Sequence, residues 1–123
     1  SVIGVRRSTI ENDPETCLAF VRAMMKALVA VQADHEMAAR VLEKEFSTLT
    51  QEGRDAALNR AWEDQLWSVD GWISRQAVET NMDVLENSGI FQGKWSYEEL
   101  VDMRFVKQLA PELGITLPEE AAE

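Results

Sequence analysis

The stretch ENDPETCLAFVRAMMKALVAV, residues 11–31, decides the fold. Within its last part, residues 17–31, only Arg22 and Lys26 are not apolar. A helix with so few polar positions needs apolar cover on nearly all of its sides. The stretch therefore raises the question of what covers such a helix in a chain of 123 residues with a net charge of -10.

Residues typical of helix N-termini predict three helices in the first half of the chain. Asp13 is a favourable N-cap and Pro14 suits the first helical position, so the apolar stretch predicts a helix from there to about residue 33. Asp34 predicts the start of a second helix, which carries apolar residues at helical spacing as far as Phe46. After a break, Thr48 or Thr50 caps a third helix, whose apolar stripe comprises Leu58, Ala61, Trp62, Leu66 and Val69.

Two more helices are expected in the second half. Ser74 caps the fourth, which stops at Gly89 in the C′ position. Ser96 has capping-box spacing to Glu99 and opens the fifth, which bears Leu100, Val101, Phe105 and Leu109. Pro111 and Gly114 are expected to end it.

The N-terminal segment SVIGVRR, residues 1–7, is rich in β-branched residues and predicts one short strand. No other convincing strand is present to pair with it, although a strand needs a partner for its backbone groups. The expected fold is mainly α, with about five helices plus this strand. Residues 1–117 are expected to form a single helical domain, and residues 118–123 a flexible acidic tail.

Composition narrows the class of protein. Apolar residues at 46% and charged residues at 28% are typical of a soluble globular domain. The net negative charge argues against nucleic acid and anionic lipid as partners, because both require a surplus of Lys and Arg. The longest uninterrupted apolar runs, such as residues 27–31, are far shorter than the ~20 residues of a membrane span, and the first residues do not resemble a signal peptide.

The sequence nominates no catalytic residue, metal site or cofactor. The lone His35 has no ligand-spaced companion, and the single cysteine, Cys17, lies among apolar residues as an inert buried thiol would. The glycines are scattered singly and form no phosphate-binding loop. We therefore do not expect an enzyme.

Four residues are candidates for ligand contact. Trp67 falls on the polar side of the third helix, so it lies either past the helix end or exposed toward a partner. Trp72 follows the Asp70-Gly71 turn, and the two tryptophans could instead pack locally around that turn. Arg6 and Arg7, at the exit of the expected strand, could hold an anion or form a solvated pair.

Taken in order, the segments resemble the C-terminal part of periplasmic solute-binding proteins of ABC importers. The strand, ENDPETCLAFVRAMMKALVAV and DHEMAARVLEKEF resemble one part of that family, and LWSVDGWISRQAVETNMDVLENSGIF with SYEELVDMRFVKQL resembles its closing segment. The most similar group binds nitrate, sulfonates, taurine or pyrimidine precursors of thiamine. The resemblance covers nearly all 123 residues.

The resemblance implies two α/β lobes with solute held between them, of which this chain supplies helices and one strand. It implies a small-molecule solute and an ABC permease as partners, an extracytoplasmic location, periplasmic or membrane-anchored, and a mainly scaffolding role for this segment. The sheet that covers residues 17–31 would then lie elsewhere in the protein, and the isolated segment could self-associate. The alternative is a free-standing acidic helical domain that binds a basic protein and buries its first helix itself.

Overall fold

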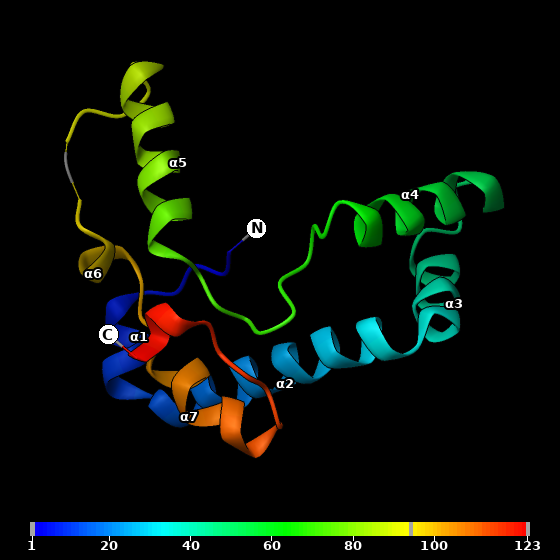
Figure 1. The fold of residues 1–123 in the computed structure, drawn as a ribbon, viewed down its shortest axis with the longest axis horizontal. Helices are drawn as coiled ribbons and strands as arrows, with labels where there is room; N and C mark the ends of the chain where they lie inside the picture. Colours follow the sequence, from blue (N-terminus) through cyan, green and yellow to red (C-terminus); the bar gives the residue numbers. More distant parts are fainter. Residues whose placement is uncertain (1, 94, 123) are drawn as a thin grey trace. The chain divides into compact units, whose positions relative to one another are not determined.

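The computed structural model describes residues 2–93 and 95–122, and these are mainly helical, as the sequence predicts (Figure 1). Its contacts divide the chain into two compact units. Unit 1 comprises Ser1–Val21 and Trp72–Glu123, and unit 2 comprises Arg22–Gly71. The helices are α1 (Arg7–Asn12), α2 (Pro14–Ala33), α3 (His35–Glu45), α4 (Gln51–Glu63), α5 (Arg75–Asn87), α6 (Tyr97–Leu100), α7 (Arg104–Glu112) and the 3-10 turn η1 (Glu119–Ala122).

Helix α2 is the apolar helix that the sequence predicts, and most of its surface is exposed. Its N-cap is confirmed, because the Thr16 backbone N–H donates to Asp13 Oδ1 over 3.2 Å. Phe20 is 49% exposed and Met24 40%. The helix is long and apolar enough to cross a membrane, but a core helix or a signal sequence passes the same test. Only 11% of its most apolar window is buried, so the described residues do not supply the cover that such a helix needs.

The predicted N-terminal strand is absent from the described residues. Residues 2–6 have no regular structure, and Arg7 already begins α1. Val2, Ile3 and Val5 are 71%, 57% and 51% exposed. The described part of the chain holds no second strand, so this segment has no ladder in which to pair its backbone N–H and C=O groups.

In unit 2, α3 and α4 pack against each other, and both begin at capped positions. Asp34 accepts from the Met37 N–H over 2.8 Å. Of the two candidate caps of α4, Thr50 is the one used, because it accepts from the Gly53 N–H over 3.1 Å. The buried apolar residues of this unit are Met25, Ala38, Leu58 and Ala61.

Helix α4 is shorter than its apolar stripe predicts. It ends at Glu63, and Gln65 adopts a left-handed conformation with φ of 50°. The Leu66 N–H then donates back to the Ala61 carbonyl over 2.9 Å, which closes the helix end. Leu66 and Val69, which the sequence places on the stripe, are therefore outside the helix and 63% and 61% exposed.

In unit 1, both ends of α5 are as predicted. Ser74 accepts from the Ala77 N–H over 3.2 Å, and Gly89 follows the helix with φ of 71°. The buried side chains of the unit come from the start of α2 and from α7, and they are Cys17, Phe105, Val106, Leu109 and Ala110.

The predicted fifth helix is two helices, α6 and α7. Its capping box is confirmed, because Glu99 Oε2 accepts from the Ser96 N–H over 2.8 Å and Ser96 Oγ accepts from the Glu99 N–H over 3.3 Å. The chain then becomes extended at Val101, with ψ of 129°. Asp102 competes with a continuous helix by accepting the Arg104 backbone N–H over 3.1 Å, so α7 starts afresh. It ends one residue beyond Pro111, which lies inside it.

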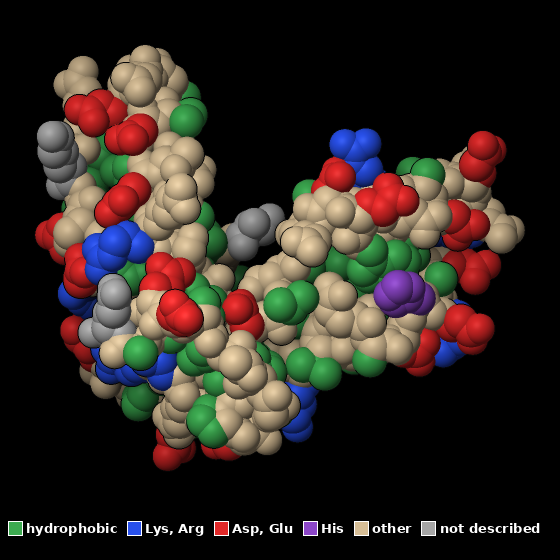
Figure 2. Space-filling model, viewed as in Figure 1, with side chains coloured by type: hydrophobic (Ala, Val, Ile, Leu, Met, Phe, Trp, Pro, Cys, Tyr) green, Lys and Arg blue, Asp and Glu red, His purple; other side chains and the backbone are tan. Residues whose placement is uncertain are grey.

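Acidic side chains are spread over the face of the molecule that Figure 2 draws, as their dispersal in the sequence indicates. On this face, acidic side chains lie on α5 in unit 1 and on α3 and α4 in unit 2, and they form no single acidic block. An evenly spread charge of this kind favours solubility over the binding of one highly basic ligand.

Candidate functional site

A groove of about 610 Å³ lies within unit 1. Its walls come from the N-terminal segment and α1, the residues before and at the start of α5, α6 with its link to α7, α7 itself and η1. The volume is in the range that small-molecule sites occupy. The groove therefore brings together segments from both ends of the chain, and we take it as the candidate site.

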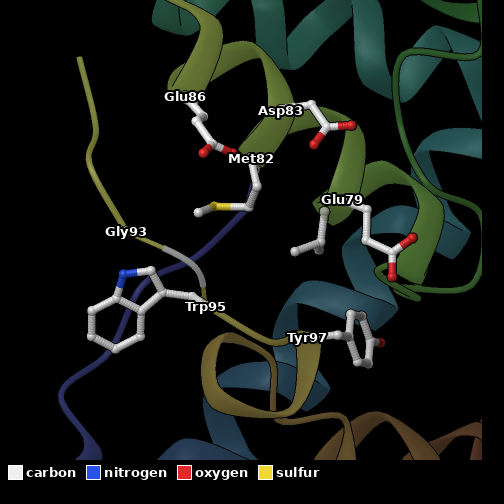
Figure 3. A pocket seen from close by; sticks show the side chains of 8 residues that line it. Glu79, Met82, Asp83, Glu86, Gly93, Trp95 and Tyr97 are labelled. Atoms are coloured by element: carbon white, nitrogen blue, oxygen red, sulfur yellow. The ribbon is translucent and has the colours of Figure 1, made fainter. Parts of the chain in front are cut away.

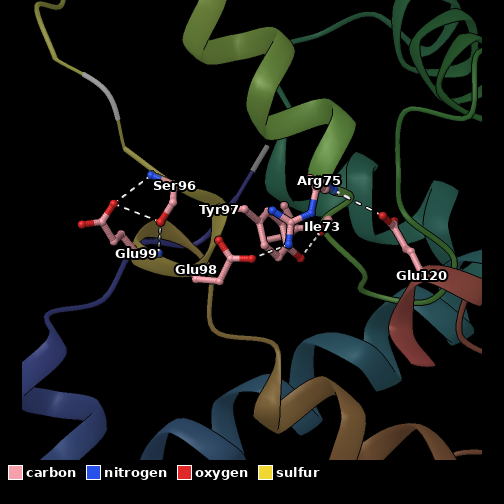
Figure 4. A network of polar contacts seen from close by, with 7 residues as sticks. All are labelled: Ile73, Arg75, Ser96, Tyr97, Glu98, Glu99 and Glu120. Carbon is pink, nitrogen blue, oxygen red and sulfur yellow. Dashed lines mark hydrogen bonds and ion pairs between the residues drawn. The ribbon is translucent and has the colours of Figure 1, made fainter. Parts of the chain in front are cut away.

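Tyr97 and Arg75 form the centre of a polar network on one wall (Figure 4). The Tyr97 hydroxyl donates to the Ile73 carbonyl over 2.6 Å, and the Arg75 guanidinium lies 4.6 Å from the centre of the Tyr97 ring. Arg75 also forms an ion pair with Glu98. Burial raises the pKa of the Tyr97 hydroxyl, and the negative charge of Glu120 adds to this effect. These contacts hold α6 against the start of α5.

Trp72 lies half-buried on another wall. Its Nε1–H donates to Glu120 Oε1 over 2.7 Å, and the Lys107 ammonium lies 5.6 Å from the centre of its ring. A cation at that distance is attracted to the face of the indole. Trp72 is thus held from two sides, by α7 and by η1.

Two arginines of the groove stay charged because carboxylates lie beside them. Arg75 donates a hydrogen bond to Glu98, which raises the pKa of Arg75, and Arg104 donates one to Asp102, which raises the pKa of Arg104. Both cations therefore neutralise carboxylates of their own chain. The groove combines aromatic faces with fixed charges of both signs, which suits binding of a small polar molecule.

Two of the four predicted contact residues lie in this groove. Trp72 and Arg7 both line it, and Arg7 Nη2 donates to the Glu99 carbonyl over 3.4 Å. Arg6 immediately precedes α1 and is exposed. Trp67 belongs to unit 2, past the end of α4, where its ring meets Trp62 edge-on at 6.2 Å.

The sequence did not indicate an aromatic cluster in unit 2. His35, expected to be solvated, is exposed but also stacks on Trp62, with ring centres 3.7 Å apart and planes inclined by 13°. Trp62 is half-buried, and its Nε1 is buried without a hydrogen-bond partner among the described residues. The stack joins the start of α3 to α4 and so fastens the helical pair.

A smaller pocket of about 200 Å³ lies between α5 and residues 93–97 (Figure 3). Its lining mixes carboxylates of α5 with a thioether and two aromatic rings, and includes Glu79, Met82, Asp83, Glu86, Trp95 and Tyr97. Among the residues that the structure describes, no group of His, Cys, Asp or Glu side chains is placed to hold a metal ion.

The ion pair of Arg75 with Glu98 predicts a pH dependence. The hydrogen bond from Arg75 lowers the pKa of Glu98 below its ordinary value of 4.5. The carboxylate therefore stabilises the fold fully above pH 4.5, and this contribution is lost as the pH falls through the lower folded-state pKa. Glu98→Gln removes this titrating carboxylate, so the free energy of unfolding should fall less steeply as the pH is lowered. Urea unfolding between about pH 3 and 6 measures this change. The exposed Glu86→Gln is the control, and an equal change there would contradict the assignment.

Comparison with known proteins leaves the family of this chain open. The resemblance to solute-binding proteins accordingly stays a prediction from sequence motifs, and the function has to be argued from the exposed apolar surface and from the groove. No protein-family model matches the sequence, and no curated protein or solved structure is significantly similar to it.

Proposed function

We propose that this chain is part of the substrate-binding component of an ABC importer and that it acts mainly as scaffold. The solute is a small organic or anionic compound of the nitrate, sulfonate, taurine or pyrimidine type. The observation that carries the proposal is the uncovered apolar face of α2, on which Phe20 and Met24 are 49% and 40% exposed.

The exposed N-terminal segment supports the same proposal. Val2, Ile3 and Val5 have a composition that favours a strand, yet they are exposed and without regular structure. A sheet supplied by the rest of the protein would satisfy both needs at once. It would pair the backbone of residues 2–6, and its face would cover α2 as helices cover parallel sheets.

In this proposal the solute lies between two lobes, and its binding favours the closed form that the permease recognises. Trp72 and Arg7 are the residues of this chain best placed to contribute, because they share one groove. Arg6 and Trp67 lie outside it and are weaker candidates. The protein would work outside the cytoplasm, in the periplasm or anchored to the membrane.

The alternative, a free-standing acidic domain that binds a basic protein, is less well supported. It calls for a bundle that buries the apolar helix at its centre. The exposure of Phe20, Met24 and Val29 does not suit such a bundle.

Solute binding tests the proposal. The intact natural protein should be stabilised against heating by one of nitrate, taurine, an alkylsulfonate or an aminopyrimidine, because a ligand that binds the folded state raises Tm. Residues 1–123 alone should show no shift with any of them, since most of the cleft is missing. Micromolar binding by residues 1–123 alone, or no response from the intact protein to any of the four, would contradict the proposal.

A further inference from the structure

The last residues of unit 1 follow its surface after α7. The Ile115 N–H donates to the Ala110 carbonyl over 2.9 Å, and Gly114, with φ of 66°, lets the chain reverse there. Beyond this point the inward side of the segment is half-buried and comprises Ile115, Leu117, Pro118, Glu120 and Ala121. We refer to residues 115–122 as the C-terminal strap.

Glu120 fastens the strap to the start of α5. Its Oε1 accepts from Trp72 Nε1 over 2.7 Å, and its Oε2 accepts from the Arg75 backbone N–H over 3.4 Å. Figure 4 shows Glu120 reaching from η1 toward Arg75. Hydrogen bonds to an ionised carboxylate are stronger than neutral ones, and the first turn of a helix favours a negative charge. One side chain thus joins segments that are more than 40 residues apart in sequence.

The same residue is part of the groove. Glu120 and Trp72 both line it, so the position of the strap decides how far the indole is covered. Among the residues that the structure describes, the other hydrogen bonds of the strap are the one at the Ile115 turn and the η1 bond from the Ala121 N–H to the Pro118 carbonyl, and its apolar side chains are at most half-buried. Segments with shallow burial and local hydrogen bonds are the first to open in a folded protein.

We propose that the C-terminal strap is a movable cover of the groove, latched by the Glu120 carboxylate, and that its release uncovers Trp72. In the latched form Trp72 is held between Lys107 and Glu120. In the released form the indole Nε1–H and the first N–H of α5 no longer donate to Glu120 and can donate to another acceptor. The strap therefore controls access to this wall of the groove, whichever solute the protein binds.

Hydrogen exchange of the full chain tests the latch. Glu120→Ala should speed amide exchange of residues 115–122 by about tenfold, because a charge-assisted hydrogen bond no longer opposes opening. Glu119→Ala is the matched control, since Glu119 is the exposed neighbour of the same type and should leave exchange unchanged. Exchange in α7 should stay slow in both variants, which shows that unit 1 is folded.

Hydroxyl-radical footprinting then tests the cover. Oxidation of Trp72 should rise in Glu120→Ala and not in Glu119→Ala, with Trp67 and Trp95 of the same molecule as internal standards. Trp72→Phe keeps an aromatic side chain but removes the indole N–H donor, so it should also speed amide exchange of the strap. The proposal is overturned if Glu120→Ala exchanges and is oxidised like the unaltered chain, or if Glu119→Ala has the same effect.

Discussion

The double substitution Phe20→Ser and Met24→Ser should weaken self-association of residues 1–123 by at least tenfold. A tenfold change corresponds to about 1.4 kcal/mol, and the apolar area that the substitution removes is expected to contribute at least that much to association. The two side chains lie one helical turn apart on α2 and are 49% and 40% exposed. A face of this kind gains free energy when a second copy covers it, so the unaltered chain should associate at micromolar concentrations.

Sedimentation velocity over a concentration series measures this effect, and binding of a dye that fluoresces on apolar surfaces gives a second readout. Ala19→Ser and Ala23→Ser form the matched control, because they place the same hydroxyls on exposed positions of α2 without removing a large side chain. A chain that stays monomeric at high concentration and binds no dye would show that α2 is covered after all.

Leu109→Ala should cost about 2–5 kcal/mol of the free energy of unfolding, the range for large-to-small changes in a packed core. Leu109 is 0% exposed, and its neighbours on α7, Phe105 and Val106, are also buried. The cavity left by the substitution would remove contacts from the centre of unit 1, whose core is small. Total stabilities of small domains are 5–15 kcal/mol, so the loss is a large share of the whole.

Urea unfolding followed by circular dichroism measures this loss. The exposed neighbour Gln108→Ala is the control and should change the free energy of unfolding by less than about 0.5 kcal/mol. An effect of Leu109→Ala no larger than that of Gln108→Ala would mean that α7 does not form the core of unit 1.

The capped helix starts were predictable from the sequence, as were the ends of α2 and α5, but the end of α4 and the N-terminal strand were not. Thr50, Ser74 and Ser96 cap α4, α5 and α6 by bonds to an N–H three residues ahead, which is a local pattern. The predicted end of α4 was wrong, because an apolar stripe does not indicate the left-handed turn at Gln65 that follows the helix. The strand predicted in residues 1–7 is absent from the described residues, because a strand depends on a distant partner.

The candidate site was predictable only in part for the same reason. Arg7 is recognisable in the sequence as an exposed cation, and Trp72 as an aromatic residue beside a turn. Only the fold brings the two to one groove. Tyr97, Lys107 and Glu120 were missed as site residues. Tyr97 and Glu120 form hydrogen bonds to residues just before α5 that lie 24 and 48 residues away in the sequence, and Lys107 meets Trp72 only across the face of its ring. No spacing pattern in the sequence indicates such pairs.

The size and location of the natural gene product distinguish a two-lobed solute-binding protein from a small free-standing domain. An antibody raised against residues 1–123 can be used to blot cell fractions of the source organism. We expect a band of about two to three times 13.9 kDa, the size of a two-lobed protein, released with the extracytoplasmic fraction. A band of about 13.9 kDa in the cytoplasm would contradict it.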